Sequence, residues 1–293
     1  MIFIGAFGIG REATALRAQH LFLPLEKTMK IKKFSAALVA TFFFVSGAAA
    51  LETDVAPEVT SLANPAPKTG LFVGNSFTYY NCGVNDYVRG LTKAGRQKWT
   101  ARMITISGGA LAFHPVEFYV SPHERDPYFK NGNTRPFDVV FLQGQSARPI
   151  SEKHLPVYRK YLKAHIEAVR KAGGEPVVVG TWARQDSPEQ TRTIADLVIA
   201  EANKNHALVL PVGLAFAESL KERPELILHH SDKRHPSAAG SYLYGAMVYS
   251  LLFKKSPEGL DFLGDCAKPL SKKDARFLQR IAWRVTKEFY GWD

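Results

Sequence analysis

The sequence predicts a three-layer α/β/α sandwich, flavodoxin-like, around a central parallel sheet of about five strands, the usual size of such sheets. Uninterrupted apolar runs such as FDVVFL (residues 137–142) are typical of strands that are buried on both faces. Segments with helical periodicity of ten or more residues separate these runs, as expected for crossovers between parallel strands. The alternation of the two patterns therefore indicates an α/β domain.

Each element follows from its local pattern. The predicted strands are residues 70–73, 100–106, 137–142, 176–179 and 207–212. The predicted helices are residues 86–94, 151–172, one that Ser187-Pro188 opens, 237–253 and 273–289. In residues 151–172 the apolar positions recur every three or four residues, which is the spacing of a helix face. Residues 112–136 are rich in His, Pro, Asn and charged residues without periodicity, so we predict a long insertion of the kind that often carries function.

The first fifty residues do not resemble part of this fold. Residues 29–50 combine a basic start, an apolar segment at 34–45 and small residues up to Ala50, which are the three parts of a secretory signal. We therefore expect translation to start at Met29, cleavage near Ala50, and a periplasmic or secreted protein. An uncleaved anchor is the alternative, although the apolar run is shorter than the roughly 20 residues of a membrane span. Residues 51–69, with several prolines, are predicted to be a linker before the α/β domain at 70–293.

The composition excludes some partners. The formal net charge is +11, but basic residues alternate with acidic ones. No basic helix, aromatic platform or zinc spacing accompanies this charge, so we expect no nucleic-acid binding. No later stretch is apolar enough to predict an integral membrane domain. Cys82 and Cys266 could pair in an oxidising compartment, and the sequence leaves this open.

Polar residues follow the predicted strands where a parallel sheet binds its ligands, at the carboxyl ends of the strands. These segments are GNSFT (74–78), SGGA (107–110), QGQS (143–146) and SDKRHPS (231–237). Together they supply a hydroxyl, backbone N–H groups, amide side chains and an Asp–His pair. Acyl transfer requires these parts.

Three side chains suit nucleophilic catalysis. The Ser76 hydroxyl needs a base to take its proton, and His235 is the candidate because imidazole can accept a proton near neutral pH. Asp232, three residues earlier, could orient the imidazole and stabilise its protonated form.

An oxyanion would need hydrogen-bond donors fixed in advance. The candidates are the N–H groups of Ser76 and of Gly108 or Gly109, with the side-chain amide of Gln145 or, as the lesser candidate, Gln143.

Each signal also has a structural interpretation. Ser76 could be the N-cap of a helix, and Gly108-Gly109 could be an ordinary turn. Asp232 to His235 could cap the helix at 237–253. His229 and His230 with these two residues could bind a metal ion, but no standard ligand spacing is matched, so we predict no metal.

Taken in order, the blocks resemble those that define the SGNH (GDSL-type) serine hydrolases: a GDS-like serine motif, a glycine, a G-x-N segment and a D-x-x-H motif. The resemblance covers residues 70–253. Asn75 replaces the usual Asp beside the nucleophile, and QGQS lacks the Asn of the third block, so a glutamine would have to supply that amide. The α/β-hydrolase elbow G-x-S-x-G is not matched, because Thr78 stands where its second glycine would be.

The resemblance implies an esterase that needs no cofactor and that acts on a small-molecule or polysaccharide ester. For an exported member, removal of acetyl or other short acyl groups from carbohydrate is the expected activity. The alternatives are a lipid or lysophospholipid acylhydrolase with the same three residues, and a non-catalytic glycan-binding member of the fold. Asn75, His114 and Trp182 are the candidate substrate-binding residues.

Overall fold

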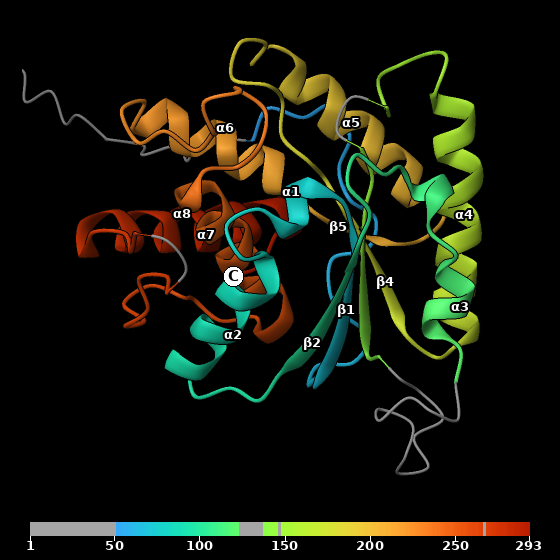
Figure 1. Ribbon diagram of the computed structural model, residues 1–293, viewed down its shortest axis with the longest axis horizontal. Coiled ribbons are helices and arrows are strands. Elements are labelled where there is room, and N and C mark those ends of the chain that lie inside the picture. Colours follow the sequence, from blue (N-terminus) through green and yellow to red (C-terminus); the bar gives the residue numbers. More distant parts are fainter. Residues whose placement is uncertain (1–50, 123–136, 146–147, 266–267) are drawn as a thin grey trace, which may run out of the picture. The chain divides into compact units, whose positions relative to one another are not determined.

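The central sheet has five strands, all parallel. In the computed structural model, which describes residues 51–122, 137–145, 148–265 and 268–293, the order across the sheet is β2-β1-β3-β4-β5 (Figure 1). The strands are β1 (Thr69–Gly74), β2 (Thr100–Thr105), β3 (Val139–Gln143), β4 (Glu175–Val179) and β5 (Leu208–Leu210). This order is the flavodoxin-like doubly wound order, with its switch point between β1 and β3. The predicted fold class is confirmed.

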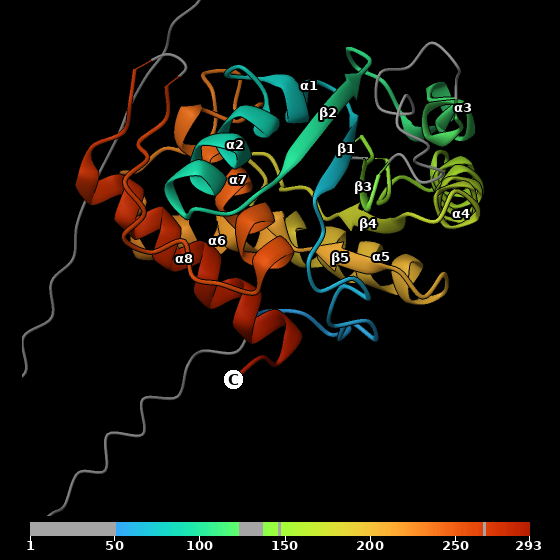
Figure 2. The same cartoon turned by 90° about the horizontal axis from the view of Figure 1, so that it is seen from below.

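Helices cover both faces of this sheet. On one side lie α3 (Val116–Val120) and α4 (Leu155–Lys171), and on the other α2 (Val84–Ala94) and α7 (Ala238–Phe253) (Figures 1 and 2). The remaining helices are α1 (Ser76–Tyr79), α5 (Gln190–Asn203), α6 (Val212–Glu222) and α8 (Lys272–Tyr290), with a short 3-10 turn at Leu111–Phe113. Helix α7 is buried all round from Ala239 to Leu252, because it packs against α2, α6 and α8.

The core is built from the strands and from the helix faces that pack on them. Leu71, Phe72 and Val73 of β1 are fully buried, as are Phe141 and Leu142 of β3. The register pairs Phe72 with Phe141, and their rings stack with centroids 4.7 Å apart. Such central strands hold the loops at their carboxyl ends in fixed positions.

Two predicted elements differ in extent from those observed. The strand predicted at residues 207–212 is shorter, because β5 ends at Leu210 and α6 begins at Val212 after Pro211, which has no N–H to continue a ladder. The insertion at 112–136 is also not entirely irregular, since α3 lies within it; residues 123–136 are outside the described part.

The predicted linker is packed rather than free. Within residues 51–69, Val55, Val59 and Leu62 contact the core. Side chains of the domain also bind its backbone: the Ala63 N–H donates to the Glu175 carboxylate at 2.9 Å, and Asn203 both donates to the Ala56 carbonyl and accepts from the Glu58 N–H. The segment is therefore part of the folded unit.

Other predictions lie outside the described residues. They concern the signal sequence and Met29 in residues 1–50, and the pairing of Cys82 with Cys266, because Cys266 is not described. In the parts of the chain that are described, no helix is both long and apolar enough to span a membrane.

Candidate active site

The turn after β1 presents Ser76 at the carboxyl edge of the sheet. Asn75 caps the short helix α1, since its side-chain oxygen accepts the Phe77 N–H at 3.0 Å. The other end of the same amide donates to the Gly109 carbonyl at 2.8 Å, which joins the turn to the loop after β2. Ser76 is the first helical residue and is 8% exposed.

The buried side chain of Gln143 fixes this turn by hydrogen bonds. The Gln143 side-chain oxygen accepts the Asn75 N–H at 3.0 Å and the Thr78 hydroxyl at 2.9 Å. Gln143 is 1% exposed, so its amide is committed to the turn. Its side-chain nitrogen donates a short hydrogen bond to the Gly144 carbonyl. Both ends of the amide are therefore bonded within the protein, which holds the Ser76 backbone in place and does not fit the lesser prediction of Gln143 as an oxyanion donor.

The D-x-x-H segment forms a tight loop just before α7. One oxygen of Asp232 accepts the backbone N–H groups of Arg234 and His235, at 3.0 and 2.9 Å. Lys233, which follows Asp232 in the loop, has a positive φ of 62°, a left-handed conformation that the loop requires. The His230 N–H donates to the His235 carbonyl at 2.7 Å and closes the loop on its other side.

The loop and the turn meet at the histidine ring. His235 Nε2 lies 2.8 Å from Ser76 Oγ, across 159 residues of sequence. His235 Nδ1 forms a short hydrogen bond with the second oxygen of Asp232. Slight burial opposes ionisation of Asp232, but hydrogen bonds from the His235 ring and two backbone N–H groups outweigh it and lower the pKa of the carboxyl below its ordinary 3.8. The three predicted side chains are thus in one hydrogen-bonded row.

Two aromatic rings that the sequence interpretation missed fix the imidazole. Tyr80 stacks on the His235 ring at a centroid distance of 4.1 Å and an angle of 5°, and Phe77 meets it edge-on at 5.6 Å. Phe77 lies within the GNSFT segment and Tyr80 two residues after it, so their closeness to Ser76 in the sequence was the available signal.

The predicted oxyanion donors are not equivalent. The Gly109 N–H donates to the Ile106 carbonyl at 2.9 Å and is occupied. In the described part of the chain, the N–H groups of Ser76 and Gly108 donate no hydrogen bond. Gly108 has a φ of 65° and no neighbour that a Cβ would meet within 4 Å, so its backbone faces open space.

Gln145 lies beside Gly108 at the rim. Its side-chain nitrogen approaches the Gly108 carbonyl at 3.4 Å, and its oxygen accepts a short hydrogen bond from Arg148 Nε. Its amide nitrogen is therefore held next to the Gly108 carbonyl. Of the two candidate glutamines, Gln143 is buried and Gln145 is partly exposed.

The three candidate substrate-binding residues are buried, and their side chains pack or form hydrogen bonds within the protein. Asn75 is 3% exposed and its amide is used as described above. His114 is 3% exposed, and burial lowers the pKa of its imidazole. Trp182 is 2% exposed, stacks between Phe77 and Phe216, and donates its indole N–H to the Arg234 carbonyl at 3.0 Å. Trp182 thus positions the Ser76 and His235 segments relative to each other.

His229 and His230 do not converge with Asp232 and His235 on a common point. His229 is buried and its Nε2 lies 3.0 Å from the Ala183 carbonyl. Among the residues that the structure describes, no group of three or more His, Cys, Asp or Glu side chains is arranged to hold a metal ion.

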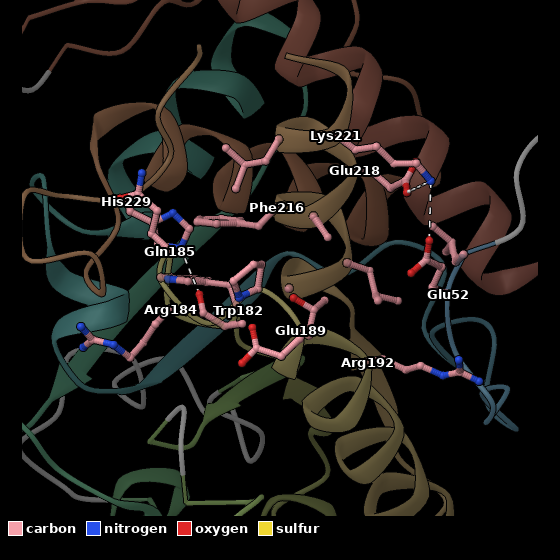
Figure 3. Close-up of a pocket in the computed structure, with 18 residues that line it drawn as sticks. Glu52, Trp182, Arg184, Gln185, Glu189, Arg192, Phe216, Glu218, Lys221 and His229 are labelled. Atoms are coloured by element: carbon pink, nitrogen blue, oxygen red, sulfur yellow. Dashed lines mark hydrogen bonds and ion pairs between the residues drawn. The ribbon is translucent and has the colours of Figure 1, made fainter. Parts of the chain in front are cut away.

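Two cavities border Trp182. One, of about 350 Å³, lies between the start of α5 and α6 and is bordered by Trp182, Phe216 and His229 (Figure 3). Ser76 and His235 are not in its lining. The other, of about 390 Å³, also has neither Ser76 nor His235 in its described lining. It is bordered by Arg234, which precedes His235 in the loop, and by Gln145, whose side chain approaches the Gly108 carbonyl.

Solved structures include proteins whose fold is similar to that of this chain. No family model and no curated protein sequence matches the chain. A DUF4886 family protein from Bacteroides uniformis is similar over 74% of this chain and 93% of its own, with 16% identity and a TM-score of 0.57. The chain shares the fold of this protein.

Two further structures are similar over a smaller part. An acetyl xylan esterase matches 62% of this chain and 98% of its own, with 17% identity and a TM-score of 0.48. A member of the lipolytic G-D-S-L family from Veillonella parvula matches 62% of this chain and 96% of its own, with 14% identity and a TM-score of 0.45.

Proposed function

We propose that this chain is an exported serine esterase of the SGNH (GDSL) type that removes acetyl or other short acyl groups from carbohydrate. The observation that carries the proposal is the row of hydrogen bonds from Ser76 Oγ through His235 to Asp232. A hydroxyl within 2.8 Å of an imidazole that is oriented by a carboxylate is the arrangement that activates serine.

The mechanism uses these groups in two steps. His235 takes the Ser76 proton as Oγ attacks the ester carbonyl, and it then gives that proton to the departing alcohol, which leaves an acyl-serine. Water attacks this ester, again losing its proton to His235, and the carboxylic acid is released as Ser76 recovers its proton. Asp232 stays ionised throughout and stabilises the imidazolium, in agreement with the lowered pKa of its carboxyl.

The negative oxygen of each tetrahedral intermediate needs donors on the side of Ser76 away from the base. The N–H groups of Ser76 and Gly108, which donate no hydrogen bond within the described residues, and the amide of Gln145 are the proposed donors. Loss of one such donor typically costs about 3 kcal/mol of transition-state stabilisation. We therefore expect Gln145→Ala to lower kcat with little change in KM.

A carbohydrate substrate is supported by the cleft that Gln145 and Arg234 border. Seven of the ten residues in its described lining have polar or charged side chains: Gln145, Arg148, Ser151, His154, Arg184, Gln190 and Arg234. Sugar hydroxyls can form hydrogen bonds with such side chains, whereas a long acyl chain cannot. This favours the deacetylase over the lipid acylhydrolase.

Labelling with a fluorophosphonate probe tests the enzyme proposal. The wild type should be labelled and Ser76→Ala should not, while Ser107→Ala, which removes another hydroxyl at the same edge, should still react. A folded wild type that resists the probe would support the non-catalytic glycan-binding alternative.

Hydrolysis of p-nitrophenyl esters from acetate to palmitate tests the acyl group. We expect kcat/KM to be greatest for acetate and to fall with chain length. A preference for the long chains would instead support the lipid acylhydrolase.

A further inference from the structure

The cleft that Gln145 and Arg234 border is basic. Three arginines line it, Arg148, Arg184 and Arg234, and no Asp or Glu is in its described lining. Its volume of about 390 Å³ is within the range of small-molecule sites, about 300–1,000 Å³.

Two of these guanidinium groups have no carboxylate partner in the described part of the chain. Arg184 is neutralised by Asp186, with nitrogen–oxygen distances of 2.9 and 3.2 Å. Arg148 instead donates to the neutral amide of Gln145. Arg234 lies over the Phe77 ring, with its guanidinium carbon 5.8 Å from the ring centroid. Both are partly buried, so their charges are less screened than those of extended surface side chains.

The backbone around these side chains is fixed. The Arg234 N–H donates to Asp232 and its carbonyl accepts from the Trp182 indole, so the residue is held next to His235. Arg148 is tied to the candidate oxyanion donor Gln145. An anionic group that binds these arginines would therefore lie close to the reacting ester.

We infer that the cleft binds an anionic oxygen group, a carboxylate or a sulfate, on the alcohol portion of the ester, and that Arg148 and Arg234 select for it. The planar fork of arginine matches the oxygens of such groups, and hydrogen bonds to charged groups are stronger than neutral ones. The substrate class is then an acylated acidic sugar. This inference rests on the proposed function and narrows its substrate.

The kinetic test compares three acetylated methyl glycosides: those of glucuronic acid, of glucose 6-sulfate and of glucose. The wild type should show a kcat/KM at least tenfold higher for one or both anionic esters than for the neutral ester. The preference should shrink as salt is added, because ions screen the attraction. The relative rates of the uronate and the sulfate identify the preferred anion.

Substitutions assign the preference to residues. In Arg234→Gln and in Arg148→Gln the ratio of kcat/KM for the anionic ester to that for the neutral ester should fall about tenfold, the loss of roughly one charge-assisted hydrogen bond. Arg276→Gln, which removes the same charge from the exposed face of α8, should keep the wild-type ratio. An unchanged ratio in both cleft variants would overturn the inference.

A binding measurement on a catalytically inactive variant tests this inference separately from the esterase proposal. Titration calorimetry of Ser76→Ala with the same three glycosides needs no turnover. Tighter binding of an anionic glycoside, weakened by Arg234→Gln, supports the inference even if no ester is hydrolysed. Equal binding of all three glycosides would overturn the inference of an anion-selective cleft. If the wild type still hydrolysed the neutral acetate, the esterase proposal would nevertheless be supported.

Discussion

At the scale of single residues, the turn that carries Ser76 depends on an amide that does not reach solvent. The Gln143 oxygen is the common acceptor for the Asn75 N–H and the Thr78 hydroxyl. Both donors are buried, so losing their acceptor would leave each without a hydrogen bond. A buried donor left unsatisfied costs about 1–3 kcal/mol.

We therefore expect Gln143→Leu to lower the free energy of unfolding by about 2–5 kcal/mol, as measured by urea denaturation. Gln97→Leu is the control, since that amide makes one local bond, to the Gly95 carbonyl, and should cost less than about 1 kcal/mol. Equal effects of the two substitutions would show that Gln143 does not support the turn.

Asp232 gives a second residue-scale prediction, for pH. Its pKa is lower in the folded chain than its ordinary 3.8, so the ionised carboxylate stabilises the fold above that pH and the contribution is lost as pH falls through the folded pKa. At neutral pH the wild type should unfold less readily than Asp232→Asn. The difference should shrink steadily below pH 3.8, as chemical denaturation at a series of pH values would measure. A difference that is constant with pH would contradict the lowered pKa.

At the scale of elements, helix α7 places the D-x-x-H loop. A Cβ at Gly240 would lie 2.3 Å from the Leu228 carbonyl and 2.9 Å from the Phe216 ring. The Ser237 N–H donates to the same carbonyl, at 2.8 Å, so the start of the helix is in direct contact with the segment just before the loop. The position of His235 therefore depends on a helix residue that has no side chain.

Gly240→Ala should accordingly destabilise the protein by about 1–3 kcal/mol, the usual cost of overpacking, although alanine favours helices elsewhere. It should also lower kcat for p-nitrophenyl acetate, because the loop must move. Gly245→Ala on the same helix is the control: its Cβ would meet Tyr87 at 2.6 Å, away from the loop. It should destabilise the fold but leave kcat near that of the wild type. Equal losses of kcat would mean that the loop does not depend on Gly240.

At the scale of the whole molecule, residues 51–69 pack along the domain although their sequence resembles a linker. Asn203 of α5 binds both the Ala56 carbonyl and the Glu58 N–H, and the Trp292 indole near the C-terminus donates to the Thr60 carbonyl at 2.8 Å. Residues distant in sequence thus hold the start of the domain.

Removing the Asn203 side chain should loosen the packing of residues 51–62 on the domain. We expect Asn203→Ala to speed proteolytic cleavage within residues 51–62 severalfold, followed by mass spectrometry, because local opening exposes the backbone. Asn205→Ala, which removes a bond to the Glu201 carbonyl within the last turn of α5, is the matched control and should not. Equal cleavage in the two variants would contradict the role of Asn203.

Much of the fold could be predicted because its signals are local. The apolar runs and the three-or-four-residue spacing placed all five strands and most long helices within a few residues of their observed bounds. The rule that parallel strands present ligands at their carboxyl ends then brought Ser76, Asp232 and His235 into one hypothesis. Residue types and their order along the chain were sufficient for this.

Only the tertiary structure decided which polar groups are available. Hydrogen bonds within the protein occupy the side-chain amides of Asn75 and Gln143 and the N–H of Gly109. The Gly108 N–H, in contrast, donates no hydrogen bond within the described residues. The stacking of Tyr80 on His235 and the meeting of Arg148 and Arg234 in one cleft likewise depend on contacts between distant segments. The sequence determined which chemical groups reach this edge of the sheet, because strand ends are locally encoded. Their hydrogen-bond partners depend on how the ends pack together, and no local pattern carries that information.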